Sequence, residues 1–216
     1  MIEELVHARV RLALHRLRDG EGTALLFLHG LGERSPQRLD RRYDAWPGPV
    51  AALDFTGHGA STVPSGGGYT AEILMADADV ALGRLGCATV VGRGLGGYVA
   101  LMLAGARPEQ VRGAIILDGP GLAGGGTGTT SPFVPVVDRT ALAPPDPFAL
   151  ADLATDIRPP DYASLYARLA SQFSQLARPV SVCARERASW LQAVTAEAGV
   201  EETTLEEALA YYARRR

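Results

Sequence analysis

The sequence predicts a single α/β domain in which a mostly parallel β-sheet carries helices on both faces. Short continuous apolar runs, such as ALLFLHG at 24–30 and VAALDF at 50–55, are typical of strands that are buried on both faces. Segments with helical spacing alternate with these runs along the chain, which is the pattern of a parallel sheet covered by helices. The 216 residues show no internal repeat and no second core, and they suffice for one domain.

The N-terminal part of the chain predicts an antiparallel strand or hairpin beside this sheet. Residues 6–18 alternate between apolar and polar side chains in the manner of a half-buried strand, and Asp19 and Gly20 close the segment with a turn. The polar, Arg-rich segment at 33–45, between the first two buried runs, is long enough to contain a short helix.

The rest of the chain continues the alternation of helices and strands. Thr70 is a suitable N-cap, with Glu72 close behind it and Gly86 at the far end, so a helix is expected between them. The other expected helices span 95–106, 147–156, 161–177, 188–198 and 203–215, and the other expected strands span 88–92, 111–119 and 179–184.

The C-terminal end of the sheet is expected to be short. Only about four residues, at 199–202, remain for a last strand. An exposed strand edge can be covered by pairing with another chain, so a homodimer is one expectation for this end of the molecule.

A long segment interrupts the regular alternation after the strand at 111–119. Residues 119–147 are rich in Gly, Pro and Thr and are expected to form a loop. Loops of this length inside a compact domain are usually lids or binding segments. We therefore predict a lid-like insertion at about 119–178, which includes the helices expected at 147–156 and 161–177.

Composition excludes several classes of function. Hydrophobic residues make up 47% of the chain, charged residues 21%, and the net charge is −3, so neither a nucleic acid nor an anionic membrane is expected as partner. All 21 basic residues are Arg, which excludes a catalytic Lys. We read the absence of Lys together with the many Ala and Gly residues as a bacterial type of composition.

Localisation and cofactors follow from what the chain lacks. No apolar run reaches the length of a membrane span, and the N-terminus lacks the apolar core of a signal peptide, so a cytoplasmic protein is expected. Cys87 and Cys183 have no metal-binding spacing and are expected in the core, so we predict no metal and no cofactor.

Three motifs follow three successive predicted strands. LHGLG at 28–32 ends the first strand, DFTGHGAS at 54–61 ends the second, and GRGLGG at 92–97 joins the third to a helix. In order and spacing they resemble the α/β-hydrolase family, over about residues 5–120. The resemblance implies an oxyanion loop at the first motif, the family's D-x-x-G-H-G-x-S turn at the second, and the nucleophile elbow G-x-S-x-G at the third.

The chain departs from this family at its catalytic residues. The family's chemistry needs a nucleophile, a His that takes its proton and a carboxylate that orients the His. Gly94 stands where the nucleophile belongs, so no acyl-enzyme can form there. All four His residues lie within the first 60 residues, and the region at 198–209, where the resemblance places the base, has none. Glu186 and Asp118 are the nearest candidates for the acid.

We therefore predict a degenerate member of the family that is inactive as a serine hydrolase and binds a small polar or acyl ligand or a protein partner. The resemblance implies that the backbone N–H groups of Leu31 and Leu95 form an oxyanion hole, and Leu95 also begins a helix whose dipole favours an anion. His29 and His58 are expected chiefly to hold their loops. The candidate ligand-binding residues are His29, Leu31, Arg93, Gly94, Leu95 and Asp118.

Two alternatives remain open at the level of sequence. The first is an atypical hydrolase that uses His29 or His58 through water beside an intact oxyanion hole. The second is a dinucleotide-binding protein, because Gly92, Gly94 and Gly97 spell G-x-G-x-x-G at the start of a helix and Asp118 ends the next strand. This fingerprint normally follows the first strand of its domain, however, and the first two motifs have no role in such a fold.

Overall fold

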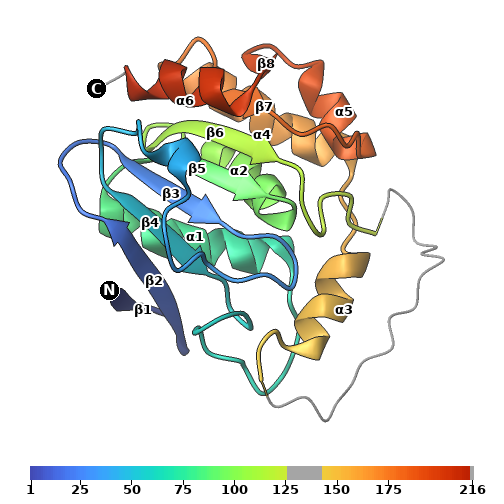
Figure 1. The fold of residues 1–216 in the computed structure, drawn as a ribbon. Coiled ribbons are helices and arrows are strands. Elements are labelled where there is room, and N and C mark those ends of the chain that lie inside the picture. The colour runs from blue at the N-terminus through green and yellow to red at the C-terminus, as the bar shows by residue number, and fades with distance from the viewer. Residues whose placement is uncertain (126–142, 215–216) are drawn as a thin grey trace.

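The computed structural model describes residues 1–125 and 143–214, and its centre is an eight-stranded sheet (Figure 1). The strands lie in the order β1-β2-β4-β3-β5-β6-β7-β8. β2 pairs antiparallel with β1 and with β4, and all other pairs are parallel. The mostly parallel sheet predicted from the sequence is confirmed. The strands are β1 (Ile2–His7), β2 (Val10–Arg18), β3 (Ala24–Leu28), β4 (Val50–Asp54), β5 (Ala88–Arg93), β6 (Val111–Leu117), β7 (Val180–Val182) and β8 (Val200–Glu202).

The N-terminal strands form a hairpin. β1 and β2 pair in a register that sets His7 against Val10, and the turn between them places Ala8 at φ 53°. The alternating segment at 6–18, expected as a strand or hairpin, thus contains the end of β1, the turn and all of β2, and the first strand begins earlier, at Ile2. Alternation alone could not reveal the turn, because the two-residue connection keeps the period of the pattern.

Helices cover both faces of the sheet, but unequally. They are α1 (Ala71–Leu85), α2 (Leu95–Ala106), α3 (Pro147–Thr155), α4 (Pro160–Phe173), α5 (Ser189–Thr195) and α6 (Leu205–Ala213). One face packs against the buried sides of α1, α2, α4 and α5 in the larger apolar core. The opposite face is covered by α6 and by the crossover at 29–49, which connects β3 to β4.

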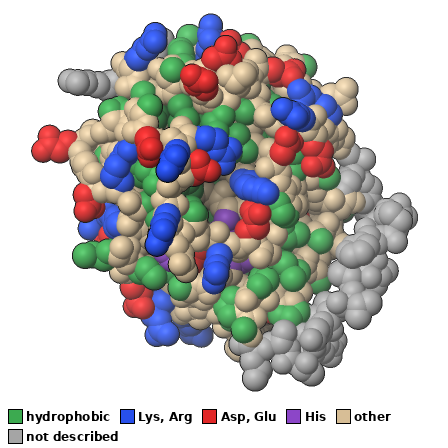
Figure 2. Space-filling model, in the orientation of Figure 1, with side chains coloured by type: hydrophobic (Ala, Val, Ile, Leu, Met, Phe, Trp, Pro, Cys, Tyr) green, Lys and Arg blue, Asp and Glu red, His purple; other side chains and the backbone are tan. Residues whose placement is uncertain are grey.

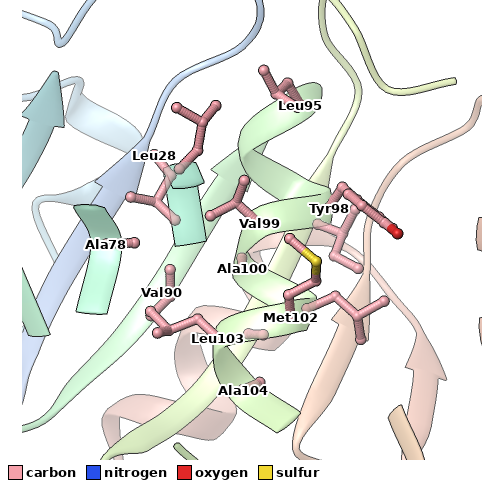
Figure 3. Close-up of a cluster of buried hydrophobic side chains, with 14 of the residues drawn as sticks. Leu28, Ala78, Val90, Leu95, Tyr98, Val99, Ala100, Met102, Leu103 and Ala104 are labelled. Atoms are coloured by element: carbon pink, nitrogen blue, oxygen red, sulfur yellow. The ribbon is translucent and has the colours of Figure 1, made fainter. Parts of the chain in front are cut away.

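The central helix α2 is buried along nearly its whole length (Figure 3). A helix that is apolar all round belongs in the interior of a domain. Glycine lets it approach the sheet backbone closely, since a Cβ on Gly96 would lie 2.3 Å from the carbonyl oxygen of Leu28, and one on Gly92 would lie 2.1 Å from that of Gly96. This close packing sets the first residues of α2 beside the carboxyl ends of β3 and β5.

The crossover from β3 to β4 contains little regular structure. Its one helical turn is the 3-10 helix η1 (Arg41–Tyr43), which lies within the segment where a short helix was expected. Tyr43 and Trp46 are buried there, and the rings of Phe27 and Tyr43 meet edge to face with centroids 4.6 Å apart. Parallel strands are usually joined by an α-helix. Here a loop covers part of the sheet face instead.

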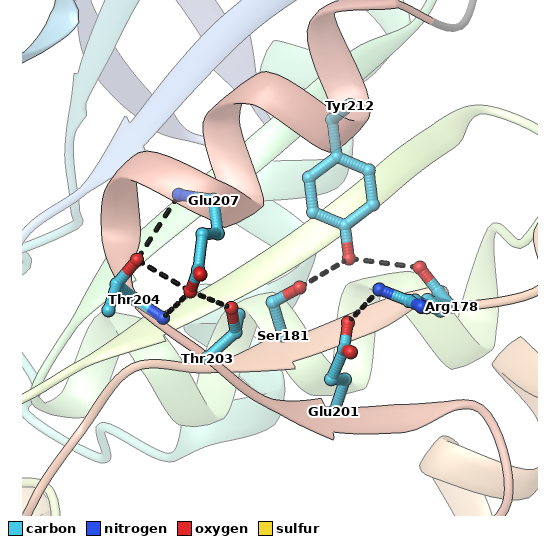
Figure 4. Close-up of polar contacts among 7 residues, drawn as sticks. All are labelled: Arg178, Ser181, Glu201, Thr203, Thr204, Glu207 and Tyr212. Carbon is cyan, nitrogen blue, oxygen red and sulfur yellow. Dashed lines mark hydrogen bonds and ion pairs between the residues drawn. The ribbon is translucent and has the colours of Figure 1, made fainter.

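The last strand is present but has only three residues, as the short C-terminal end predicted. Figure 4 shows how α6 is fixed beside it. Thr204 and Glu207 form a capping box at the start of α6, and Tyr212 donates a hydrogen bond of 3.0 Å to the carbonyl oxygen of Arg178. β8 pairs only with β7 and ends the sheet, and a homodimer through this edge stays a prediction.

The segment between β6 and β7 includes the predicted lid. Part of the loop expected at 119–147, residues 126–142, lies outside the described residues. Of the expected helices, α3 agrees closely, and α4 ends at Phe173, four residues before the expected end. A lid role stays a prediction.

Within the described residues, none of the helices has the length and apolar composition that crossing a bilayer requires. The cytoplasmic location stays a prediction.

Candidate functional site

The three sequence motifs meet at one edge of the sheet. β4, β3 and β5 are neighbours, and each motif begins at or near the carboxyl end of one of them. Parallel strands place their carboxyl ends along the same edge, where α/β folds bind ligands. Segments that are far apart in the sequence therefore form a single candidate site.

Gly94 occupies the turn between β5 and α2 in the conformation of a nucleophile elbow. Its φ of 57° and ψ of −121° lie where glycine pays no Cβ penalty. A Cβ built on Gly94 would lie 2.1 Å from the carbonyl oxygen of Pro120 and 2.6 Å from the carbonyl carbon of Gly119. Backbone from residues 119–122, called the closing segment below, therefore fills the space that a nucleophilic side chain would need.

The same carbonyl group takes up both N–H groups that the sequence predicted as an oxyanion hole. The N–H of Leu31 and the N–H of Leu95 both donate to the carbonyl oxygen of Pro120, at 2.9 and 3.0 Å. The open anion site expected from the sequence is corrected by this contact, because both of its donors are used within the chain. Sequence could not show it, since no local pattern places the Gly-Pro-Gly run after β6 against these N–H groups.

The closing segment is held from the interior. Arg158, fully buried just before α4, donates through Nη1 to the carbonyl oxygens of Gly121 and Leu122, the latter at 2.6 Å. The indole N–H of Trp190 donates to the same Leu122 oxygen at 2.8 Å. The Arg158 guanidinium lies over the ring of Tyr98, 4.8 Å from its centroid, and burial lowers its pKa to about 10. At neutral pH, a buried cation thus fixes the segment that closes the site.

His29 and His58 are buried and hold loops. His29 donates from Nδ1 to the carbonyl oxygen of the next residue and accepts at Nε2 from the N–H of Phe55. His58 donates from Nδ1 to the carbonyl oxygen of Thr56 and accepts at Nε2 from the N–H of Gly32. Burial lowers the pKa of both imidazoles, that of His29 to about 4. Both rings are therefore neutral at pH 7 with both nitrogens engaged.

The structure forms two His–carboxylate pairs that sequence reasoning missed. His15 Nε2 lies 2.8 Å from Asp54 Oδ2, and His7 Nδ1 lies 2.7 Å from Asp77 Oδ1. The Asp77 carboxylate also accepts from the N–H of Thr56, and burial raises its pKa. Separations of 39 and 70 residues leave no local signal for either pair. The first pair ties the N-terminal hairpin to the end of β4, and the second ties it to α1.

Neither candidate acid is placed to orient a base. Both carboxylate oxygens of Asp118 accept from the N–H of Arg185, and one also accepts from the N–H of Glu186. Within the described residues, no histidine hydrogen-bonds to Asp118 or Glu186. Asp118 thus serves to fix the turn that follows β7.

A cavity of about 1190 Å³ opens beside this edge, under the crossover at 29–49. His29, Arg93 and Asp118 line it, whereas Leu31, Gly94 and Leu95 do not, so the structure divides the predicted ligand-binding set. Figure 2 shows arginine side chains gathered over the middle of this face, with histidine atoms visible between them. Cys183 also lines the cavity, and burial raises its thiol pKa to about 12, so it is protonated and unreactive at neutral pH.

No metal centre is found in the part of the chain that the structure describes, where no three His, Cys, Asp or Glu side chains cluster closely enough to hold an ion.

The fold, the elbow and the three motifs together define an α/β hydrolase, and comparison with known families agrees. Residues 25–213 match the Alpha/beta hydrolase family, so the chain belongs to it.

One hydrolase is similar to this chain in sequence, and several solved structures are similar to it in fold. The chain is 32% identical over 134 residues to 2-hydroxymuconate semialdehyde hydrolase of Pseudomonas putida, a match that covers 55% of this chain and 43% of that protein. A thioesterase domain from the curacin biosynthetic pathway superposes with a TM-score of 0.65 at 17% identity, covering 99% of this chain and 98% of that one. N-formylmaleamic acid deformylase of Pseudomonas putida superposes with a TM-score of 0.65 at 12% identity, and the match covers 96% of this chain and 93% of that one.

Proposed function

We propose that this member of the α/β hydrolase family does not act as a serine hydrolase and instead binds a small polar or acyl ligand. One observation carries the proposal. The carbonyl oxygen of Pro120 accepts hydrogen bonds from both oxyanion-hole N–H groups and lies where a side chain on residue 94 would begin. The position of a developing oxyanion and that of a nucleophile are therefore both taken by the protein's own backbone.

The chemistry of acyl transfer explains why this contact matters. A triad hydrolase needs a nucleophile, a base within hydrogen-bonding reach of it, and free donors aimed at the developing negative charge. Gly94 supplies no nucleophile, and the two donors are engaged. A family relationship alone does not restore these parts, because function depends on the site rather than the fold.

The geometry disfavours an atypical hydrolase that works through His29 or His58. A general base needs a nitrogen that can reach the reacting proton, directly or through water. Each of these rings has one nitrogen donating to a carbonyl oxygen and the other accepting from a backbone N–H. Activation of water by either ring would require breaking one of these loop contacts.

The geometry also disfavours dinucleotide binding through Gly92, Gly94 and Gly97. A pyrophosphate would need free N–H groups at the start of α2. The N–H of Leu95 donates to Pro120, and the glycines at 92 and 97 are accounted for by close packing between the helix and the sheet. A small-molecule ligand is favoured over a protein partner because the adjoining cavity of about 1190 Å³ is large enough to hold one.

The test is steady-state hydrolysis of short aryl esters and of an acyl thioester by the purified wild-type protein. We expect no turnover above that of a heat-denatured sample, and the same result for Gly94→Ser. The absence of Lys keeps the background of non-specific acyl transfer low. Turnover that scales with wild-type protein and falls on His29→Asn or His58→Asn would show that the protein is an atypical hydrolase.

A further inference from the structure

The cavity under the 29–49 crossover has an apolar floor. Side chains from the carboxyl-terminal parts of β3, β5 and β6 form this floor, and the start of α6 adds to it. These side chains are Phe27, Val91, Leu117 and Leu205. The floor exists because the crossover contains only one helical turn, which leaves this part of the sheet face without a covering helix.

Arginines surround this floor, and their partners divide them into two kinds. Arg93 makes an ion pair with Glu33 at 3.3 Å, and Arg42 makes one with Asp40 at 2.9 Å. The guanidinium groups of two others, Arg34 and Arg185, have no ion pair or hydrogen bond with any residue in the described ranges. Both line the cavity and are exposed to solvent.

The lining contains four arginines and three carboxylates, so it keeps a net positive charge. Glu33 and Asp40 are the partners of arginines already counted. The carboxylate of Asp118 is directed to backbone N–H groups of the turn after β7. Among the described residues, the guanidinium groups of Arg34 and Arg185 therefore have no carboxylate paired with them beside the apolar floor.

We propose that this cavity binds a carboxylic acid with a sizeable apolar body, its carboxylate at Arg34 and Arg185 and its hydrocarbon part on the floor. The planar guanidinium fork matches a carboxylate in two hydrogen bonds, and apolar surface rewards a hydrocarbon chain. The cavity volume exceeds what a compact acid such as acetate would fill. The inference rests on the proposed non-catalytic function and names the ligand class for it.

Calorimetric titration with octanoate, decanoate and dodecanoate, each below its micelle concentration, tests the proposal, with octan-1-ol and decan-1-ol as uncharged probes. We expect one acid per chain, an affinity that rises with chain length by up to about fourfold per methylene, and alcohols at least about tenfold weaker than the matching acids. Equal affinity for acid and alcohol, or no heat with any acid, would overturn the proposal.

A pair of variants locates the site. The double variant Arg34→Gln with Arg185→Gln should weaken decanoate binding about tenfold or more, because it removes both uncompensated cations. The matched control is Arg9→Gln, an exposed arginine in the β1–β2 turn that does not line the cavity, and it should bind as the wild type does. An equal loss of decanoate affinity in the control and in the double variant would overturn the proposed site, because it would show only a general effect of charge.

The two proposals fail separately. Ester turnover by the wild type would overturn the non-catalytic role whatever the acids do. If neither acid binding nor turnover is observed, the proposed ligand class is wrong, whereas the proposal that the protein is not a serine hydrolase is still supported.

Discussion

At the scale of single residues, the conformation of Gly94 and the position of the Pro120 carbonyl group depend on each other. A glycine at the elbow accepts its positive φ without strain, and its missing Cβ leaves room for the Pro120 carbonyl oxygen. That oxygen in turn satisfies two N–H groups that would otherwise need a partner. The glycine at position 94 and the engagement of the Leu31 and Leu95 N–H groups therefore depend on the same contact.

Gly94→Ser is expected to lower the free energy of unfolding by about 2–6 kcal/mol. Strain at positive φ accounts for roughly 1–3 kcal/mol and overlap with the closing segment for a similar amount. Urea unfolding of the variant and the wild type measures it. Gly66→Ala is the matched control, because a Cβ there has nothing within 4 Å, and its effect should stay within about 0.5 kcal/mol. An unchanged midpoint for Gly94→Ser would show that residues 119–120 do not occupy this space in solution.

Elements from the C-terminal half of the chain hold the closing segment in place. Arg158 precedes α4 and Trp190 lies in α5, and both donate to carbonyl groups of that segment. Two nitrogens of Arg158, Nε and Nη2, are buried and have no hydrogen-bond partner within the described residues. Burying a charged group is costly, because the group loses its hydration. The hydrogen bonds from Arg158 Nη1 to the closing segment are therefore the main interactions that offset this cost.

Arg158→Ala is expected to destabilise the protein by about 2–4 kcal/mol, because it leaves a cavity and removes a charged donor from two buried carbonyl groups. Hydrogen exchange should report the local effect, with faster exchange at the N–H groups of Leu31 and Leu95 as the closing segment loosens. Arg168→Ala, on the exposed side of α4 in an ion pair with Glu197, is the control and should change stability by less than about 1 kcal/mol. Protection of both N–H groups that matches the wild type would contradict the role given to Arg158.

At the scale of the whole molecule, the two faces of the sheet differ in how they are covered. The face under α1, α2, α4 and α5 is closely packed and provides the main core. The opposite face is covered by α6 and an irregular crossover and contains the cavity. The stable part of the fold therefore positions a site whose cover is loop rather than helix.

Global stability should fall as the pH drops from about 6.5 to about 4. The pKa of His29 is lowered from 6.5 to about 4 by burial first and then by the neighbouring His58, whose own pKa is also lowered. The unfolded chain therefore binds more protons in this range, and the stabilisation present above pH 6.5 is lost on acidification, by up to about 3 kcal/mol from His29. The raised pKa of Asp77 acts in the opposite direction.

Urea unfolding at intervals from pH 4.5 to 7.5 measures this dependence. His29→Gln should be less stable at neutral pH and should show a flatter slope, because the titrating ring is gone. An identical slope in wild type and variant would mean that other groups carry the acid sensitivity.

Much of the architecture could be predicted because it depends on local patterns. The continuous apolar runs at β3 and β4, the helical spacing of α1 and the three motifs at strand ends are readable within short windows. The glycine at position 94 and the absence of His after position 58 are likewise read directly from the sequence. The N-terminal hairpin was one of the two forms expected there, but the position of its turn could not be read because a tight turn does not disturb an alternating pattern.

The sequence by itself determined the fold class, the family resemblance and the bare elbow at Gly94. Only the tertiary structure decided that the Pro120 carbonyl accepts from the N–H groups of Leu31 and Leu95, that His7 and His15 pair with Asp77 and Asp54, and that arginines line a cavity on the loop-covered face. The physical reason is the separation in sequence between the residues that interact. Strands and helices follow from neighbours a few residues apart, whereas each of these contacts joins segments whose proximity exists only once the sheet has assembled.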